Sequence, residues 1–246
     1  VSTGFRAGGF NTFSDFIGQP FEEERAINFE GGVRSTWFDG RLTVNGTGFA
    51  LFYDDIQVTT PTAVGDSGIL VNLIENAAKA RTIGTEISLA AEPVPGLALG
   101  LDYGLSLTRV REFESAAGDL SGLRLPNAPV HSLALTAEYQ HPLPGDIGDA
   151  FLRGEFNYTS PASLLPSTLG GALSDSFEFD ARTLVNLRLG LRADRYEVEL
   201  FAENITNDRN FTGITGATTL GPAFGFPAPV ETEAGRRFGI RASVYF

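Results

Sequence analysis

Strict alternation of apolar and polar side chains is the feature that most limits what this chain can fold into. In residues 184–192, apolar side chains occupy the odd positions from Val185 to Leu191, and glycine, asparagine or arginine follows each of them. Successive side chains of a β-strand point to opposite faces, so this period predicts strands with one apolar and one polar face. Similar runs predict about ten strands in an all-β, antiparallel fold. They lie near 1–10, 22–37, 41–58, 72–91, 97–111, 130–140, 150–160, 179–193, 195–205 and 233–246.

The expected connections alternate between short and long. The short ones are 38–40, 92–96, 141–148 and 193–194. The long ones are 11–21, 59–71, 112–127, 160–178 and 206–231. Outer-membrane barrels have short periplasmic turns and long extracellular loops, and a tilted strand crosses a bilayer with about 9–11 residues. We therefore expect a transmembrane β-barrel wall, with both chain ends on the periplasmic side because the strand number is even.

Composition excludes several other classes of protein. The chain has no Cys, so it forms no disulfide scaffold and no thiolate metal site. The net charge is −12, which argues against a nucleic-acid partner because such proteins are normally basic. No stretch reaches the ~18 apolar residues that a membrane helix requires. Strands therefore remain as the elements that can cross a bilayer.

Candidate chemical sites are few. The 65–68 segment (Gly-Asp-Ser-Gly) matches the surroundings of a protease nucleophile, but His131 and His141 follow it, whereas that protease class places its His and Asp before the Ser. Acidic clusters at 22–24 and 54–55 carry the oxygen ligands that Ca²⁺ prefers, although solvated strand ends explain them as well. We expect no enzyme activity, no catalytic residue, no metal and no cofactor.

Several segments resemble, in the same order, the motifs of the TonB-dependent outer-membrane receptor family. The segments are 4–11 (GFRAGGFN), 24–32 with 37–42 (WFDGRL), 52–58 (FYDDIQV), 76–86 (NAAKARTIGTE), 125–129 (LPNAP), 203–207 (ENITN) and 235–237 (GRR). The chain ends in Val244, Tyr245 and Phe246, which resemble the C-terminal signal that the barrel-assembly machinery reads. The resemblance covers almost the whole chain.

The resemblance implies the fold, the cargo and the partners. Family members have a 22-stranded barrel, an internal plug domain and a TonB box. Residues 1–246 match only the C-terminal portion of the barrel, so we expect an open barrel segment with plug and TonB box absent. The implied function is TonB-energised uptake of a scarce nutrient in the Gram-negative outer membrane, with a ferric siderophore as first candidate. Implied partners are outer-membrane lipid, the plug and remaining barrel, TonB, the assembly machinery and the iron chelate.

No ligand-binding residue can be assigned from the sequence, although we hypothesise that the longest connection, 206–231, touches the ligand. Aromatic residues near strand ends indicate either interfacial girdles or contact with the ligand from the extracellular mouth. They are Trp37, Phe49, Phe52, Tyr53, Phe156 and Tyr158. Three alternatives stay open: a complete small pore or adhesin barrel of about ten strands, an outer-membrane enzyme such as a lipase, and a soluble β-sandwich binding module. Pairing between the first and last strands distinguishes the complete barrel from the open segment.

Overall fold

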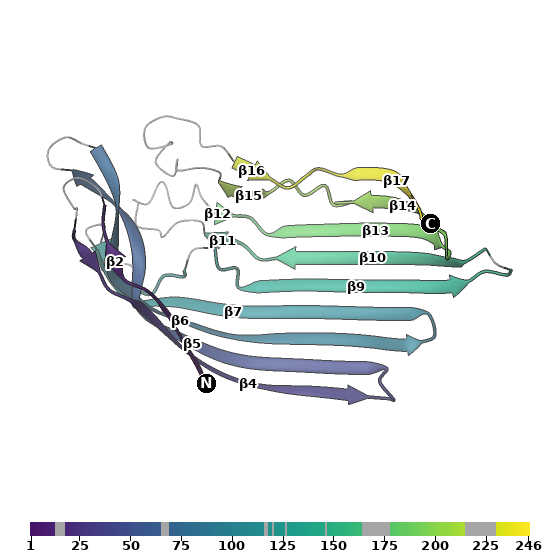
Figure 1. Cartoon of the computed structure of the whole chain (residues 1–246), viewed down its shortest axis with the longest axis horizontal. Coiled ribbons are helices and arrows are strands. Elements are labelled where there is room, and N and C mark those ends of the chain that lie inside the picture. Colours follow the sequence, from purple (N-terminus) through teal and green to yellow (C-terminus); the bar gives the residue numbers. More distant parts are fainter. Residues whose placement is uncertain are drawn as a thin grey trace.

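One antiparallel sheet contains most of the chain in the computed structural model (Figure 1). The structure describes residues 1–12, 18–64, 69–115, 118–119, 121–125, 127–145, 147–163, 178–214 and 230–246. The sheet follows the order β1 (Ser2–Arg6), β4 (Glu24–Trp37), β5 (Leu42–Val64), β6 (Ile69–Val94), β7 (Leu97–Ser115), β9 (His131–Pro142), β10 (Asp149–Thr159), β13 (Arg182–Arg192), β14 (Tyr196–Glu203) and β17 (Arg237–Val244). The short β8 (Gly118–Asp119) pairs with β7. The all-β, antiparallel prediction is confirmed. In the described ranges, no helix is long and apolar enough to cross a membrane.

The two ends of the sheet differ, as the alternation of connections predicts. Tight turns join β4 to β5, β6 to β7, β9 to β10 and β13 to β14 at the short-turn end, where the C-terminus also lies (Figure 1). Three two-stranded ladders extend the opposite, long-loop end. They pair β2 (Gly9–Phe10) with β3 (Pro20–Phe21), β11 (Ala162–Ser163) with β12 (Glu178–Phe179), and β15 (Phe211–Ile214) with β16 (Val230–Thr232).

The cross-strand register gives the sheet one apolar and one polar face. Leu42 lies opposite Ala91, Ala91 opposite Leu99, and this row continues across the sheet to Phe238. Large apolar side chains on this face are exposed. They are Ile27, Phe29, Val33, Trp37, Ile83, Ile87, Leu99, Leu107, Leu135, Tyr139, Leu152, Leu187, Leu189, Val198, Leu200, Phe238, Ile240 and Val244. A soluble protein would cover such a surface, so the face needs an apolar environment.

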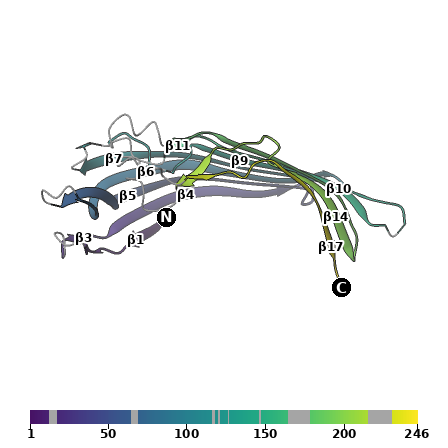
Figure 2. The same cartoon turned by 90° about the horizontal axis from the view of Figure 1, so that it is seen from above.

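The sheet does not close on itself. β1 and β17 occupy its two edges, and nine strand pairings connect them in a single arched layer (Figure 2). This arrangement confirms the open barrel segment and does not fit the complete ten-stranded barrel. β1 pairs only with the Glu24–Asn28 part of β4, so the outer edge of residues 29–37 has no strand partner in the described chain.

Several strand bounds differ from those predicted. The strand near 1–10 is two strands, because the chain leaves the sheet after Arg6 and β2 turns to pair with β3. The expected connection 59–71 is largely a continuation of β5 and β6 as a long hairpin. A bulge at Tyr53–Ile56, where Asp55 has a φ of 56°, separates this extension from the membrane-length part of β5. The apolar alternation ends after Val58, where threonines and Pro61 follow, so the sequence pattern gave no sign of the extension beyond that residue.

Candidate functional site: the polar face and the long-loop end

Ion pairs cross the polar face between neighbouring strands. Arg153 on β10 contacts Glu138 on β9 at 3.1 Å and Glu155 on its own strand at 2.7 Å. In the last three strands, Arg192 pairs with Glu197 at 2.9 Å, and the opposite pairs Glu203–Arg237 and Glu199–Arg241 follow. The glutamates of these pairs are at least three-quarters buried, and Glu199 is almost fully buried. Glutamates are therefore largely buried on one face while leucines are exposed on the other, which is the reverse of a soluble protein.

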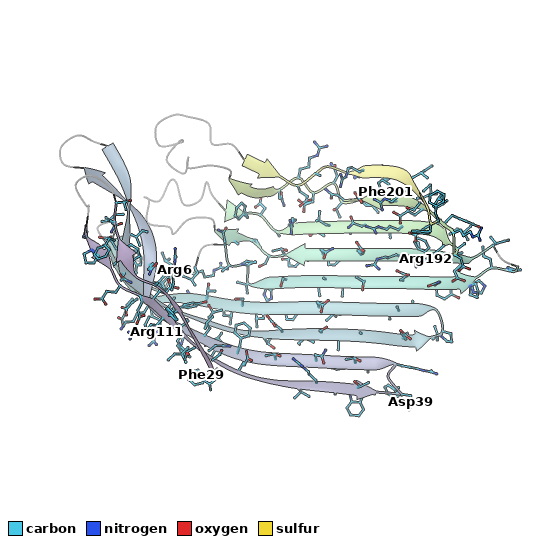
Figure 3. The ribbon with its side chains drawn as sticks, viewed as in Figure 1. Arg6, Phe29, Asp39, Arg111, Arg192 and Phe201 are labelled. Atoms are coloured by element: carbon cyan, nitrogen blue, oxygen red, sulfur yellow. The ribbon has the colours of Figure 1, made fainter. Side chains whose placement is uncertain are left out.

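Phenylalanine rings on the polar face cover glycines on the next strand. Phe151 lies opposite Gly190, and Phe201 lies opposite Gly239. In both pairs, the arginine two residues after the glycine stacks over the ring: the guanidinium carbon of Arg192 is 4.7 Å from the Phe151 centroid, and that of Arg241 is 5.3 Å from the Phe201 centroid. Figure 3 labels Arg192 and Phe201, one member of each pair. The ring supplies apolar contact that glycine lacks, and the cation interacts favourably with the ring face.

A hollow of about 500 Å³ lies over the middle strands on the polar face. Its floor combines hydrogen-bonding and charged side chains from β5, β6, β7, β10 and β13. They include Asn45, Glu86, Asp102, Asn157 and Arg182. Arg182 also contacts Glu233 at 3.0 Å, near the long-loop end. The surface suits contact with water, with a polar ligand or with another protein segment, and it does not suit lipid.

Gln57 belongs to the 52–58 segment that resembles a family motif, and it connects β5 to the segments beside the β2–β3 ladder at the long-loop end. Its side chain is buried and its Nε2 donates to the carbonyl oxygens of Ala7 at 2.9 Å and Glu22 at 3.0 Å. Its backbone N–H donates to Oε2 of Glu24 at 3.1 Å. One amide therefore satisfies carbonyls on the two segments that flank the β2–β3 ladder, where the strand pairing of β1 and β4 has ended.

Asn11 and Asn76 connect the same ladder to β6. Asn11 pairs with the backbone of Ile74 as a strand would, accepting from its N–H at 2.9 Å and donating to its carbonyl at 3.0 Å. Asn76 Nδ2 donates to the carbonyls of Glu22 at 2.9 Å and Asp55 at 2.8 Å. These residues belong to quoted motifs, and their geometry shows a structural role.

Asn204 also connects chain segments through its side-chain amide, at the start of the 206–231 connection. It is buried with a positive φ of 50°, which asparagine tolerates better than most residues. Its Nδ2 donates to the carbonyls of Asp208 and Ala234, both at 2.7 Å, and its Oδ1 accepts from the N–H of Asp208. The two sides of the 206–231 connection are thus joined where they leave the sheet.

The structure separates the residues considered for chemistry. His131 Nδ1 lies 2.9 Å from the hydroxyl of Tyr103 on the apolar face, and His141 stacks on Tyr139 at the short-turn end. The 65–68 segment lies outside the described residues. Glu23 pairs with Arg25, Glu24 binds Gln57, and no group that could hold a metal occurs in the described ranges.

The aromatic girdle prediction holds for some of its members. Trp37, Phe52, Phe156 and Tyr158 lie on the apolar face, but Phe49 and Tyr53 lie on the polar face, so the girdle prediction is wrong for these two. Phe49 instead covers Gly84, where an added Cβ would lie 2.5 Å from the ring. The C-terminal residues Val244, Tyr245 and Phe246 are exposed at the free edge of β17, and Tyr245 N–H donates to Arg195 O at 2.8 Å. Residues 215–229 of the longest connection lie outside the described residues.

An open antiparallel sheet with an exposed apolar face and an ion-paired polar face defines a segment of a membrane β-barrel wall. A family model described as TonB dependent receptor-like, beta-barrel, matches residues 1–207. The chain therefore belongs to the TonB-dependent receptor-like β-barrel family. Its relatives are transport receptors and not enzymes, which agrees with the expectation from the sequence.

Relatives and solved structures agree with this assignment. The ferric-pyoverdine 358 receptor of Pseudomonas putida is 25% identical over 206 residues, which cover 82% of this chain and 23% of that protein. The ferric yersiniabactin uptake receptor FyuA from Yersinia pestis has a TM-score of 0.76 at 18% identity, covering 100% of this chain and 34% of that chain. The ferripyoverdine receptor of the outer membrane of Pseudomonas aeruginosa has a TM-score of 0.60 at 17% identity, and the match covers 90% of this chain and 27% of that chain. The chain spans about a quarter to a third of these proteins.

Proposed function

We propose that this chain is part of the barrel wall of a Gram-negative outer-membrane receptor that takes up a ferric siderophore with energy relayed by TonB. The observation that carries the proposal is the reversed polarity of the sheet, with exposed leucines on one face and, on the other, ion pairs whose glutamates are largely buried. A bilayer solvates the first face, and a wet or protein-filled interior solvates the second. The receptors of similar sequence and structure are named for ferric pyoverdine and for the uptake of ferric yersiniabactin.

Residues 1–246 would form the C-terminal portion of that barrel. The free edges of β1 and β17 leave rows of backbone groups without strand partners, which is costly in lipid. The remaining barrel strands would pair with both edges, and a plug domain would occupy the interior beside the polar face. The hollow that Asn45, Asp102 and Arg182 line provides polar contacts for such a plug or for the ligand.

Two further assignments belong to this proposal. Val244, Tyr245 and Phe246 would present the edge of β17 to the barrel-assembly machinery, since they are exposed and follow the apolar alternation of that strand. The 206–231 connection would contact the ligand from the extracellular side, because it leaves the sheet at the long-loop end next to the Asn204 network. Deleting residues 215–229 from the receptor should then weaken chelate binding. Unchanged binding and uptake would remove the loop from the proposal.

The direct test uses the complete receptor that contains this chain, expressed in a Gram-negative strain that lacks its own copy. Uptake of radiolabelled ferric siderophores is measured with TonB present and with TonB deleted. The proposal predicts accumulation that requires both the receptor and TonB. Uptake that persists without TonB, or the absence of binding to every ferric siderophore in a chemically diverse panel, would contradict it.

A further inference from the structure

Two arginines lie directly opposite each other on the apolar face. The cross-strand row that starts at Ile27 and Phe52 continues to Arg81 on β6 and Arg109 on β7. Residues opposite each other on one face have Cβ atoms about 4.5–5.5 Å apart, and like charges in such positions repel. Both side chains are exposed and neither forms an ion pair within the described part of the chain. Arg109 donates one hydrogen bond to the carbonyl oxygen of Gly122, which leaves the positive charge of its guanidinium uncompensated. An anion bound between them would remove this repulsion.

More cationic side chains lie beside this pair. A hollow of about 310 Å³ is lined by Phe52, Tyr53, Asp54, Lys79, Ala80, Arg111 and Glu112. Lys79 neutralises Glu112 at 3.3 Å, and Asp54 lies opposite Arg25, which itself pairs with Glu23. Arg111 is exposed at the long-loop end (Figure 3). It is the third arginine of the patch that has no ion pair among the described residues. The net charge of this patch is positive although that of the chain is −12.

The patch lies where a membrane span would end. On β6, the apolar face runs from Ala91 through Ile83, and Arg81 is the next residue on that face, ten residues from Ala91. On β7 the same face runs from Leu99 through Leu107 before Arg109. A tilted strand crosses the hydrocarbon with about 9–11 residues. The cations therefore start at the depth where the acyl chains of a bilayer give way to phosphate groups.

We propose that Arg81, Arg109 and Arg111 bind the phosphate groups of an anionic lipid in the outer leaflet, whose acyl chains lie on the leucine surface of β6 and β7. Arginine suits this task because its planar guanidinium donates two parallel hydrogen bonds to phosphate oxygens. A free phosphate ion lacks the apolar part that the adjoining surface would bury. The lipid is therefore the occupant that matches both the charge and the apolar belt. The inference rests on the proposed function for the orientation of the sheet in the outer membrane.

The test measures lipid retention by the complete receptor. Receptor purified in non-ionic detergent is incubated with lipid A, a doubly phosphorylated glycolipid, or with the same lipid after removal of both phosphates. Bound lipid is counted by native mass spectrometry. The test variant is R81Q/R109Q, and the control is R41Q/R195Q, which removes the same charge from exposed positions in the short turns. A difference in gel mobility between unheated and boiled samples shows that each variant is folded.

We expect the wild type and the control to retain phosphorylated lipid A. We expect R81Q/R109Q to bind it about thirtyfold more weakly, which corresponds to about 2 kcal/mol for two arginines near a charged lipid surface. R81K/R109K should lie closer to the wild type than to the glutamine variant, because it keeps the charge. Equal retention of dephosphorylated lipid, an equal loss in the control, or competition by millimolar inorganic phosphate alone would overturn the proposal. Siderophore uptake is a separate readout, so failure of uptake would not be confused with failure of lipid binding.

Discussion

The ring of Phe151 on β10 fills the space that a side chain at Gly190 on β13 would occupy. An ideal Cβ built on Gly190 would lie 2.6 Å from two ring atoms of Phe151 and 2.6 Å from the carbonyl oxygen of Val198. Arg192 stacks over the same ring, and the Phe201–Gly239–Arg241 group repeats the arrangement. The polar face thus contains packed aromatic contacts between its ion pairs, and these contacts fix the register of the last strands.

Gly190→Ala in the complete receptor should destabilise the barrel, because the new methyl group would overlap both the Phe151 ring and the backbone of β14. Overpacking of this kind costs about 1–3 kcal/mol. Urea unfolding in detergent, followed by the shift in gel mobility, measures the change. Gly46→Ala is the matched control, since no atom lies within 4 Å of its ideal Cβ. Equal stability of both variants would show that Phe151 does not constrain this position.

Glu199→Gln should destabilise the pairing of β14 with β17. The almost fully buried carboxylate pairs with Arg241, which also stacks on Phe201, so neutralising it leaves that arginine without its counter-ion. We expect a loss of about 1–3 kcal/mol, below the 3–5 kcal/mol for a fully buried pair because Arg241 is half exposed. The double variant E199Q/R241Q should lose less than the sum of the single losses. Additive losses in this double-mutant cycle would argue against a direct interaction.

Gln57→Leu should loosen the long-loop end while the barrel itself stays folded. The substitution keeps the volume but removes the Nε2 donor from the carbonyls of Ala7 and Glu22, while the Glu22 carbonyl keeps its bond from Asn76. Because both carbonyls belong to exposed residues, we expect a local loss of about 0.5–1.5 kcal/mol for each bond removed. Hydrogen exchange of residues 18–24 should accelerate. Gln140→Leu is the control, because its bond to Asp149 lies at the short-turn end. Unchanged hydrogen exchange of residues 18–24 in the Gln57 variant would show that Gln57 does not hold this segment in place.

Removal of Phe246 should lower the yield of assembled receptor in the outer membrane without changing the stability of the molecules that do assemble. Phe246 is fully exposed beyond the last strand, so its side chain buries no surface against the described residues. Quantitative immunoblotting of outer-membrane fractions, together with unfolding of the purified barrel, separates the two effects. A normal yield would remove Phe246 from the assembly signal.

The sequence predicted the strands and their two faces better than the side-chain contacts at the long-loop end. In β13 the alternation of Val185 to Leu191 with polar residues identified the strand and its two faces, because lipid on one side and charge on the other impose the period. The roles of Gln57 and Asn204 were not predictable, since they depend on carbonyls brought close only by folding. The opposition of Arg81 and Arg109 depends on register, which no local pattern specifies before the strands are paired.

The central claim is that the leucine face of the sheet meets lipid and the charged face meets the barrel interior. Single cysteines placed at positions 185–189 and 191 of β13, in a receptor without other cysteines, can carry a small fluorophore, and brominated lipids quench a fluorophore that touches acyl chains. We predict strong quenching at Val185, Leu187, Leu189 and Leu191, and weak quenching at Asn186 and Arg188. Quenching without alternation, or strongest at the even positions, would contradict it.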